Sequence, residues 1–328
     1  MSVLLPAMKI LVAPLNWGLG HATRCIPLVK KYLDQGDEVV LGGDGDSLLR
    51  LRQAFPSLRF MPLAPLKMQY GTGNRQVFAM LRALPELIRF SMRDRRLLEQ
   101  FYADERFDLI ISDNRFGLFS ARLHAHTRFV YMTHQLFIRL PHGWRWLEGI
   151  VYRFHRKIWS RFDEVWVPDY ASMEHCLSGA LSHGKHSLPD KVHYIGPLSR
   201  FIPSVSPDTS YNTVILLSGP EPQRTIWEKR LIAEYGSRSE QVLLIRGIMG
   251  EPMVRRRHDR MTIVPRMSDE ALAAVLSGAK HIVCRSGYST IMDLAALQVL
   301  DKAILYPTPG QSEQEYLAEW HQSAKASK

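Results

Sequence analysis

The 328-residue chain has little cysteine and lacks several short motifs that mark common enzyme classes. Its three cysteines, Cys25, Cys176 and Cys284, form no C-x-x-C pair and cannot all be joined in disulfides, which favours a reducing compartment. The sequence contains no Walker loop and no Gly-x-Ser-x-Gly, so the signatures of P-loop nucleotide hydrolases and α/β-hydrolases are missing. No spacing of Cys, His and Asp indicates a structural metal site, and we expect no bound metal.

Long apolar runs and nucleic-acid-binding signatures are absent as well. No run is long enough to cross a bilayer as a helix, and residues 1–7 lack the pattern of a cleavable signal peptide. No helix-turn-helix, zinc-finger or RNA-binding motif occurs, so we expect no nucleic-acid partner. These absences favour a cytoplasmic protein.

The charge balance and the length show what the chain does contain. Lys and Arg number 42 against 32 Asp and Glu, which gives a net charge of +10. By itself such an excess suits nucleic acid, an anionic membrane surface or a phosphorylated substrate. With 46% hydrophobic residues over this length, the chain can bury a large core and is expected to form two domains.

Short apolar segments alternate with helical segments along the whole chain. This alternation predicts an α/β protein with two doubly wound, Rossmann-like domains. A Pro- and Ser-rich stretch at 203–208 is typical of a linker, so we expect an N-terminal domain of residues 1–203 and a C-terminal domain of residues 204–328. The C-terminal domain is expected to be short, because only a polar tail follows its last predicted helix at 314–320. Strands are predicted at 9–13, 38–41, 108–112, 129–133, 164–167 and 192–195, and then at 213–217, 242–245, 262–264, 281–284 and 302–306.

Two runs near the C-terminus each follow a predicted strand. A Ser-Gly turn between a strand and a helix leaves N–H groups and a positive dipole end facing outward, which suits a phosphate group. Asp293 lies inside the helix expected at 288–298, where its carboxylate can accept hydrogen bonds from ribose hydroxyls. Together the runs predict a sugar-nucleotide site. They are Cys284-Arg285-Ser286-Gly287-Tyr288-Ser289-Thr290-Ile291-Met292-Asp293 and Tyr306-Pro307-Thr308-Pro309-Gly310-Gln311-Ser312-Glu313-Gln314-Glu315-Tyr316.

A third loop follows the first predicted strand of the C-terminal domain. Ser218 and Gly219 open it, two prolines fix it, and Arg224 can bind a phosphate through two hydrogen bonds. The alternative is an ordinary turn with proline at a helix start. We favour the phosphate contact, because this loop and the one that carries Arg285 should be neighbours in the sheet.

The first strand of the chain leads into a Gly-x-Gly-His loop, in which Gly18 and Gly20 precede His21. No third glycine follows at the spacing of a dinucleotide fingerprint, so the loop is weak support for NAD. Asp113 lies where another strand should end, and it can orient His21 and raise its basicity. Local packing of His21 and capping by Asp113 are about equally good interpretations. His134 follows the next strand, and together with Gly18 and Gly20 it is expected to lie on the acceptor side of the site. For His134 a solvent-exposed loop position is favoured over a catalytic role.

Two segments of the expected N-terminal domain, at 78–96 and 144–159, combine arginine with large apolar residues. Tryptophan beside arginine suits a membrane interface with anionic headgroups. The alternative is a solvated helix face with a core stripe behind it. The sequence therefore predicts an anionic membrane surface as a further partner. It also predicts that the protein lies peripherally at the inner face of the cytoplasmic membrane.

The runs quoted above resemble family 28 of the inverting, two-Rossmann-domain (GT-B) glycosyltransferases, whose best-known member makes lipid II for peptidoglycan. Asp293 stands where the family usually has Glu, and Glu315 stands where it has a second Gln. These departures indicate a separate branch with a different acceptor. By this resemblance the donor, a UDP-sugar, is bound by Arg285, Ser286, Gly287, Thr290, Asp293, Gln314 and Glu315.

The resemblance implies a UDP-sugar-dependent hexosyltransferase with its active site in the cleft between the domains. The enzyme would move an N-acetylhexosamine, as in UDP-N-acetylglucosamine, or a hexose to a hydroxyl of a cell-envelope, lipid-linked or other glycan acceptor. His21, oriented by Asp113, would take the proton of that hydroxyl. Loop N–H groups and Arg224 or Arg285 would stabilise the leaving diphosphate, with no metal and no cofactor besides the UDP-sugar.

Two other interpretations stay open at this point. A UDP-N-acetylglucosamine 2-epimerase uses the same two-domain architecture, but it needs a set of acid–base carboxylates around the sugar that this sequence does not readily supply. A non-catalytic subunit that binds a nucleotide sugar is the second alternative. Replacing His21 separates the classes, because transfer requires the base whereas binding does not.

Overall fold

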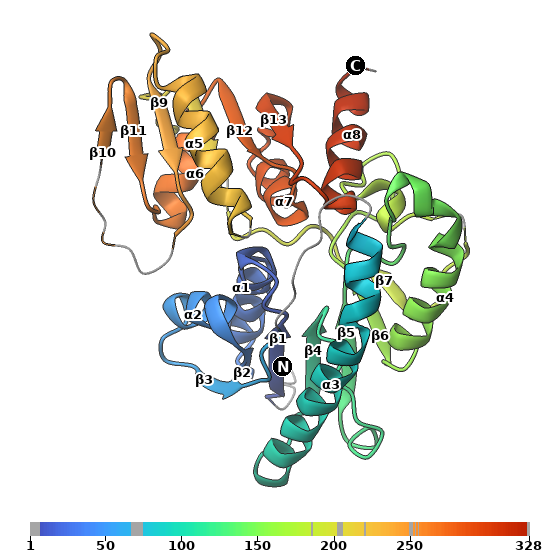
Figure 1. The fold of residues 1–328 in the computed structure, drawn as a ribbon. Coiled ribbons are helices and arrows are strands. Elements are labelled where there is room, and N and C mark those ends of the chain that lie inside the picture. The colour runs from blue at the N-terminus through green and yellow to red at the C-terminus, as the bar shows by residue number, and fades with distance from the viewer. Residues whose placement is uncertain are drawn as a thin grey trace. The chain divides into compact units, whose positions relative to one another are not determined.

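The computed structural model describes residues 7–66, 75–184, 186–201, 206–219, 221–248, 252, 254 and 256–326. The chain divides into two compact units, Met1–Leu198 and Ser199–Lys328, and each is built on its own sheet (Figure 1). The domain boundary expected after residue 203 falls among residues 202–205, which lie outside the described part, so that boundary stays a prediction. The predicted α/β class with two Rossmann-like domains is confirmed.

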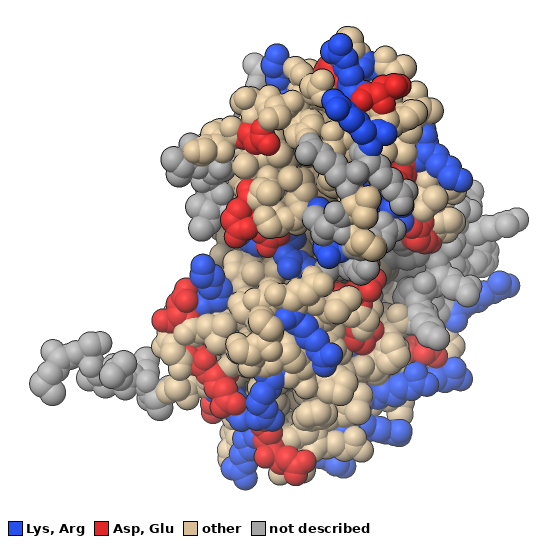
Figure 2. Space-filling view, turned by 90° about the vertical axis from the view of Figure 1, so that its left-hand side faces the viewer, with Lys and Arg blue, Asp and Glu red and all other residues tan. Residues whose placement is uncertain are grey.

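The surface mixes charges of both signs. On the face that Figure 2 shows, Lys and Arg are interspersed with Asp and Glu. Ion pairs also form within the N-terminal unit, where Nζ of Lys9 lies 2.6 Å from Glu105 and Nη1 of Arg139 lies 3.1 Å from Glu148. Within the described ranges, no helix is both long and apolar enough to cross a bilayer.

The N-terminal unit contains a seven-stranded sheet in the order β3-β2-β1-β4-β5-β6-β7. All neighbouring strands pair in parallel, so each connection must cross over a face of the sheet. The strands are β1 (Lys9–Pro14), β2 (Glu38–Gly43), β3 (Arg59–Pro62), β4 (Leu109–Asp113), β5 (Arg128–Met132), β6 (Glu164–Val167) and β7 (Val192–Tyr194). The helices are α1 (Leu19–Asp34), α2 (Gly45–Ala54), α3 (Arg75–Asp104) and α4 (Glu148–Trp159), with 3₁₀ turns η1 (His142–Leu147) and η2 (Gly179–Leu181).

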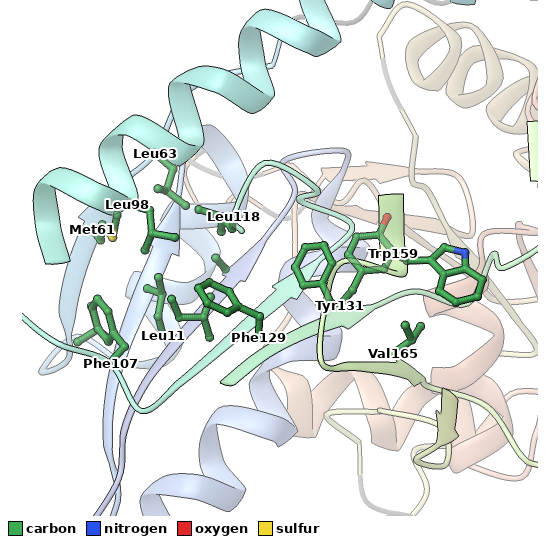
Figure 3. Packing of buried hydrophobic residues seen from close by; sticks show 14 of the residues in the cluster. Leu11, Met61, Leu63, Leu98, Phe107, Leu118, Phe129, Tyr131, Trp159 and Val165 are labelled. Carbon is green, nitrogen blue, oxygen red and sulfur yellow. The ribbon is translucent and has the colours of Figure 1, made fainter. Parts of the chain in front are cut away.

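Successive side chains of β1 explain why helices cover both faces of this sheet. Ile10 packs with side chains of α1 and α2, whereas Leu11 packs with α3 and α4, because neighbouring residues of a strand point to opposite faces. Figure 3 shows the second of these cores, in which Leu98 of α3 and Trp159 of α4 belong to the same buried cluster. Apolar side chains thus fill both faces and leave the ends of the strands to polar loops.

A buried arginine ties four segments of the N-terminal unit together. Nε and Nη2 of Arg115 donate to the two carboxylate oxygens of Asp94 in α3, at 2.8 and 3.0 Å. Nη1 donates to Asp44 after β2 at 2.8 Å, and the carbonyl of Ala64 after β3 accepts a further hydrogen bond. The guanidinium also lies 5.0 Å from the ring centre of Phe90. This network fixes the loops that leave β2, β3 and β4.

The C-terminal unit contains a six-stranded sheet in the order β10-β11-β9-β8-β12-β13. Every pair is parallel except β10 with β11, and β8 lies beside β12, as predicted for the loops that follow them. The strands are β8 (Thr213–Leu216), β9 (Val242–Ile245), β10 (Arg256–His258), β11 (Met261–Val264), β12 (His281–Arg285) and β13 (Ala303–Tyr306). The helices are α5 (Gln223–Tyr235), α6 (Asp269–Gly278), α7 (Tyr288–Ala296) and α8 (Ser312–Ala326), with a 3₁₀ turn η3 (Leu300–Lys302).

Several elements differ from the sequence prediction, among them α2, β3, β10 and α8. α2 begins inside a Gly- and Asp-rich run that resembles a loop, and Gly45 takes a φ of +53° at its first residue. β3 escapes detection because it has only four residues, with Arg59 and Pro62 exposed. α8 spans Ser312–Ala326 instead of 314–320, so the tail expected to be irregular is helical as far as residue 326.

Candidate functional site

Polar residues of the N-terminal unit gather where β1, β4 and β5 end. Ligands of open parallel sheets bind at this edge. Gly18 is exposed and takes a φ of +85° in the loop after β1, and Gly20 lies half-buried in α1. The helix begins at Leu19, so His21, which the sequence places in a loop, lies in its first turn. His21 therefore shares a helix face with Arg24.

The structure brings together the two predicted catalytic residues. Nδ1 of His21 lies 3.1 Å from Oδ1 of Asp113, the last residue of β4. Asp113 is completely buried, which by itself would raise its pKa. The positive charge of Arg24 and the hydrogen bonds from Arg24 and His21 outweigh burial and hold the pKa of this carboxyl well below its ordinary value. Asp113 is thus a carboxylate at neutral pH and can orient the imidazole.

Arg24 also belongs to this cluster, although it was not predicted as a site residue. Its Nε donates to Oδ2 of Asp113 at 2.7 Å, and its Nη2 donates to Oδ1. Its Nη1 lies 3.0 Å from Nδ1 of His134. The sequence does contain a signal for Arg24, because Arg24 follows His21 by three residues and both side chains therefore lie on one face of α1.

The interpretation of His134 as a solvent-exposed loop residue is wrong. Only 4% of its surface is exposed. The reason is the pairing of β5 with β4, which brings the residues after β5 beside Asp113, where Arg24 bridges to the imidazole. His134 is therefore part of the same buried cluster as the predicted acid–base pair.

In the C-terminal unit, Arg285 ends β12 with only 5% of its surface exposed. Its guanidinium lies 3.9 Å from the ring centre of Trp227, and Nη1 donates to the carbonyl of Pro307 at 2.6 Å. Burial, together with the charge of Arg230, lowers the pKa of Arg285 to about 10. Arg285 therefore stays a cation at neutral pH in a site with little water.

The loops after β8, β12 and β13 converge around this arginine. Oγ of Ser286 donates to the carbonyl of Gln314 at 2.7 Å, and the amide oxygen of Gln314 accepts from the N–H of Thr308 at 2.9 Å. A Cβ added to Gly219 would lie 3.7 Å from Oγ1 of Thr308. The structure thus brings together the predicted Gly219, Arg285, Ser286 and Gln314, and it adds Thr308, which was not predicted as a site residue.

Two polar atoms at this convergence have unused hydrogen-bonding capacity. Nε of Arg285 and Oγ1 of Thr308 are buried, and neither has a hydrogen-bond partner among the described residues. Buried polar groups are nearly always satisfied, so unsatisfied ones near a loop edge indicate a place where a ligand supplies the partner. An anion with several oxygen atoms suits a cationic donor beside a hydroxyl.

The remaining predicted donor residues lie on α7, α8 and the loop after β8. Gly287 is the N-terminal cap of α7, and no side-chain hydrogen bond caps this helix. Thr290 and Asp293 are half-buried on α7, and Asp293 accepts a hydrogen bond from Oγ of Ser199 at 2.7 Å. Glu315 is exposed on α8, and Ser218 is half-buried.

The structure gives Arg224 acidic neighbours. Its guanidinium donates to Glu221, and Nη1 lies 3.4 Å from Oε2 of Glu228. Glu228 is shared with Arg246, whose Nε donates to it at 2.6 Å. The charge of Arg224 is therefore largely balanced by Glu221 and Glu228. A phosphate contact by Arg224 stays a prediction, and Arg285 is the better candidate for such a contact.

Among the described residues, no group of three or more His, Cys, Asp and Glu side chains is placed to share a metal ion. The clusters that do form join carboxylates to arginines, which suits proton transfer and anion binding.

Known proteins give the class of this chain. No protein family description matches it. A relative from Methanosarcina mazei, described as an uncharacterized glycosyltransferase, is 22% identical over 325 residues, which is 94% of this chain and 82% of the relative. A second uncharacterized glycosyltransferase, from Methanosarcina acetivorans, is 28% identical over 208 residues, 59% of this chain and 50% of that protein.

Solved structures agree with this class at the level of the fold. The glycosyltransferase of kitacinnamycin has a TM-score of 0.65 and 12% identity, over 97% of this chain and 85% of its own. UGT2 of Phytolacca americana, solved with UDP-2-fluoro-glucose and pterostilbene, has a TM-score of 0.56 and 15% identity. The match covers 95% of this chain and 83% of the UGT2 chain. The fold is the GT-B fold, and by fold and sequence relatives the chain is a glycosyltransferase of this type.

Proposed function

We propose that this chain transfers a hexose or an N-acetylhexosamine from a UDP-sugar to a hydroxyl of a lipid-linked or other cell-envelope acceptor, with inversion at the anomeric carbon. The observation that carries the proposal is the contact of 3.1 Å between His21 and the buried carboxylate of Asp113. A histidine oriented by a carboxylate at the edge of a parallel sheet is a suitable general base for a hydroxyl.

In the proposed reaction, Nε2 of His21 takes the proton of the acceptor hydroxyl while that oxygen attacks the anomeric carbon. The new carbon–oxygen bond forms as the bond to the diphosphate breaks, and the electron pair of that bond leaves with UDP. Asp113 stabilises the imidazolium that forms. A single displacement of this kind inverts the configuration at the anomeric carbon.

The donor is assigned to the C-terminal unit. Arg285 is cationic and buried, and its unsatisfied Nε lies in the same group of loops as the hydroxyl of Thr308. The N-terminus of α7 adds N–H groups and a positive dipole end. The bound UDP-2-fluoro-glucose of the Phytolacca americana structural neighbour supports a UDP-sugar as the donor.

A lipid-linked acceptor is supported by an exposed apolar ridge on the N-terminal unit. Trp146, Ile150 and Phe154 are spaced by four residues along η1 and α4, and their exposed fractions are 73%, 48% and 68%. Arg153 and Lys157 are exposed on the same side of the helix. Aromatic and basic side chains together favour the interface of an anionic membrane.

The donor assignment is tested by thermal unfolding with UDP, UDP-N-acetylglucosamine, UDP-glucose, UDP-galactose, GDP-mannose and NAD. UDP compounds are expected to raise the melting temperature, because at about 100 times Kd a ligand of the folded state adds about 2.7 kcal/mol of stability. In Asp293→Ala the affinity for UDP should fall about 10- to 100-fold, since a charged hydrogen-bond acceptor is lost.

Ser199→Ala is the matched control for this test. It removes the hydrogen bond between Ser199 and Asp293 but keeps the carboxylate, so ligand-induced stabilisation should persist. The donor assignment is wrong if no UDP compound stabilises the wild-type protein, or if Asp293→Ala responds to UDP as strongly as the wild type does.

The membrane assignment is tested by co-sedimentation with vesicles that contain anionic phospholipid. The double variant Trp146→Ser/Phe154→Ser should bind roughly tenfold or more weakly than the wild type, because it removes exposed apolar area from the ridge. Ile226→Ser, which removes an exposed apolar side chain from the C-terminal unit, should bind like the wild type. Equal binding by the wild type and the double variant would contradict a membrane role for the ridge.

A further inference from the structure

The carboxylate of Asp113 is shared between two cationic partners. Oδ1 accepts from Nη2 of Arg24 and lies 3.1 Å from Nδ1 of His21, whereas Oδ2 accepts from Nε of Arg24 at 2.7 Å. Arg24 and Asp113 are both buried. Within the buried cluster, the pair that the proposed mechanism uses therefore shares its carboxylate with Arg24, which donates to both carboxylate oxygens.

The hydrogen positions in this cluster follow from what an arginine can do. A guanidinium carries five N–H donors and no acceptor, so each neighbour that bonds to it must accept. Nδ1 of His134 lies 3.0 Å from Nη1 of Arg24 and is therefore the acceptor in that contact. A neutral His134 then carries its proton on Nε2.

The same reasoning shows a conflict at His21. Its Nδ1 lies 2.9 Å from Nη2 of Arg24 and 3.1 Å from Oδ1 of Asp113. The contact with Arg24 requires an unprotonated Nδ1, because the guanidinium can only donate a hydrogen bond. The contact with Asp113 requires a proton on Nδ1, because the carboxylate can only accept one. Only the second arrangement leaves Nε2 free to accept a proton, so Arg24 and Asp113 favour opposite tautomers of the ring.

Charge gives Arg24 a second effect on His21. Among the described residues, Cys25 and Tyr131 also interact with Asp113, and burial raises the pKa of both, so neither is charged at neutral pH. Arg24 therefore balances the carboxylate, and no charge on His21 is needed. Without Arg24, the His21 ring would be the basic group left in contact with the buried carboxylate in the part of the chain that the structure describes.

We propose that Arg24 is a positioning residue, which shares the carboxylate of Asp113 with His21 and thereby sets both the charge and the tautomer of the His21 ring. This inference rests on the proposed function for its catalytic meaning. The effect on the ring itself is a property of the folded protein and is measurable without substrate.

The test is NMR of the full chain with isotope-labelled histidine, in which His21→Gln identifies the signals of His21. In Arg24→Met the midpoint of the His21 titration should move upward by about one to three pH units, because the carboxylate loses its other counter-charge. In Arg24→Lys, which keeps a cation but not the fork, the share of the ring with the proton on Nδ1 should rise.

Arg115→Met is the matched control, because it also removes a buried guanidinium from a buried carboxylate of the same unit but has no contact with His21 in the described structure. Arg115→Met should leave the midpoint of the His21 titration unchanged. If Arg24→Met does not fold, the proposal is tested by the tautomer of the His21 ring in Arg24→Lys. An unchanged midpoint in a folded Arg24→Met, an equal shift in Arg115→Met or an unchanged tautomer in Arg24→Lys overturns the proposal.

The acid limb of the pH–rate profile links the ring to catalysis. If His21 is the base, this limb should move upward with the NMR midpoint in Arg24→Met. An NMR shift with no change in the limb would leave the role of Arg24 intact and contradict the proposed role of His21. The two ideas therefore fail separately.

Discussion

Replacing His21 by alanine is expected to reduce the rate of sugar transfer by about 10²- to 10⁴-fold, the usual contribution of a general base. The substitution leaves the ion pair between Arg24 and Asp113 in place, so the fold should persist. The rate is measured as release of UDP from whichever UDP-sugar stabilises the wild-type protein. The stabilisation by UDP should be unchanged, because the donor residues belong to the other unit.

His124→Ala is the matched control for this loss. Nε2 of His124 lies 2.6 Å from Asp163, so the chain has a second His–Asp pair in the same unit, but one that is more exposed and is bonded to Phe129 at the start of β5. Its removal should leave the transfer rate within about twofold, as is usual for surface changes of roughly 0.5 kcal/mol or less. A His21→Ala protein that transfers at the wild-type rate would show that the base lies elsewhere.

Arg115→Met is expected to lower the free energy of unfolding by about 3–5 kcal/mol, because it leaves buried carboxylate oxygens of Asp94 without their cation. A loss of this size is a large part of the total stability of a domain. It is measured by chemical denaturation of the variant and the wild type. Arg122→Met, which removes an exposed ion pair with Glu99, should cost less than about 1 kcal/mol.

The loss should depend on pH in a defined direction. Burial raises the pKa of Asp94 above its ordinary value, and Arg115 opposes that rise. Without Arg115 the folded-state pKa rises further, so the folded variant binds a proton that the unfolded chain does not, and its stability falls as pH increases through that range. The difference from the wild type should be larger at about pH 7.5 than at about pH 5. The opposite trend would contradict this account of Asp94.

The sequence predicts the features that depend on local pattern. Apolar runs place most of the strands to within one or two residues, and parallel pairing then puts the loops after β8 and β12 side by side. The meeting of His21 with Asp113 follows in the same way, because both follow or end strands that are neighbours in the sheet. These predictions need only strand order and the edge at which parallel strands end.

The parts that could not be predicted depend on long-range packing of polar side chains. Arg24 and Asp113 are separated by 89 residues in the sequence, and Arg115 and Asp44 by 71. Hydrophobic periodicity says nothing about which buried arginine meets which carboxylate. The burial of His134 was missed because it depends on the pairing of β5 with β4, which brings His134 beside Asp113, and on its contact with Arg24.

The central position of β1 has a consequence for the synthesis of the chain. Ile10 of β1 pairs in parallel with Leu109 of β4, roughly 100 residues later. At translation rates of about 5–20 residues per second, this partner leaves the ribosome roughly 5–20 s after β1 does. For that interval an apolar strand edge is open to intermolecular pairing. A solubilising fusion or chaperone that acts on the nascent N-terminal segment should therefore raise the yield of folded protein more than one that acts after release.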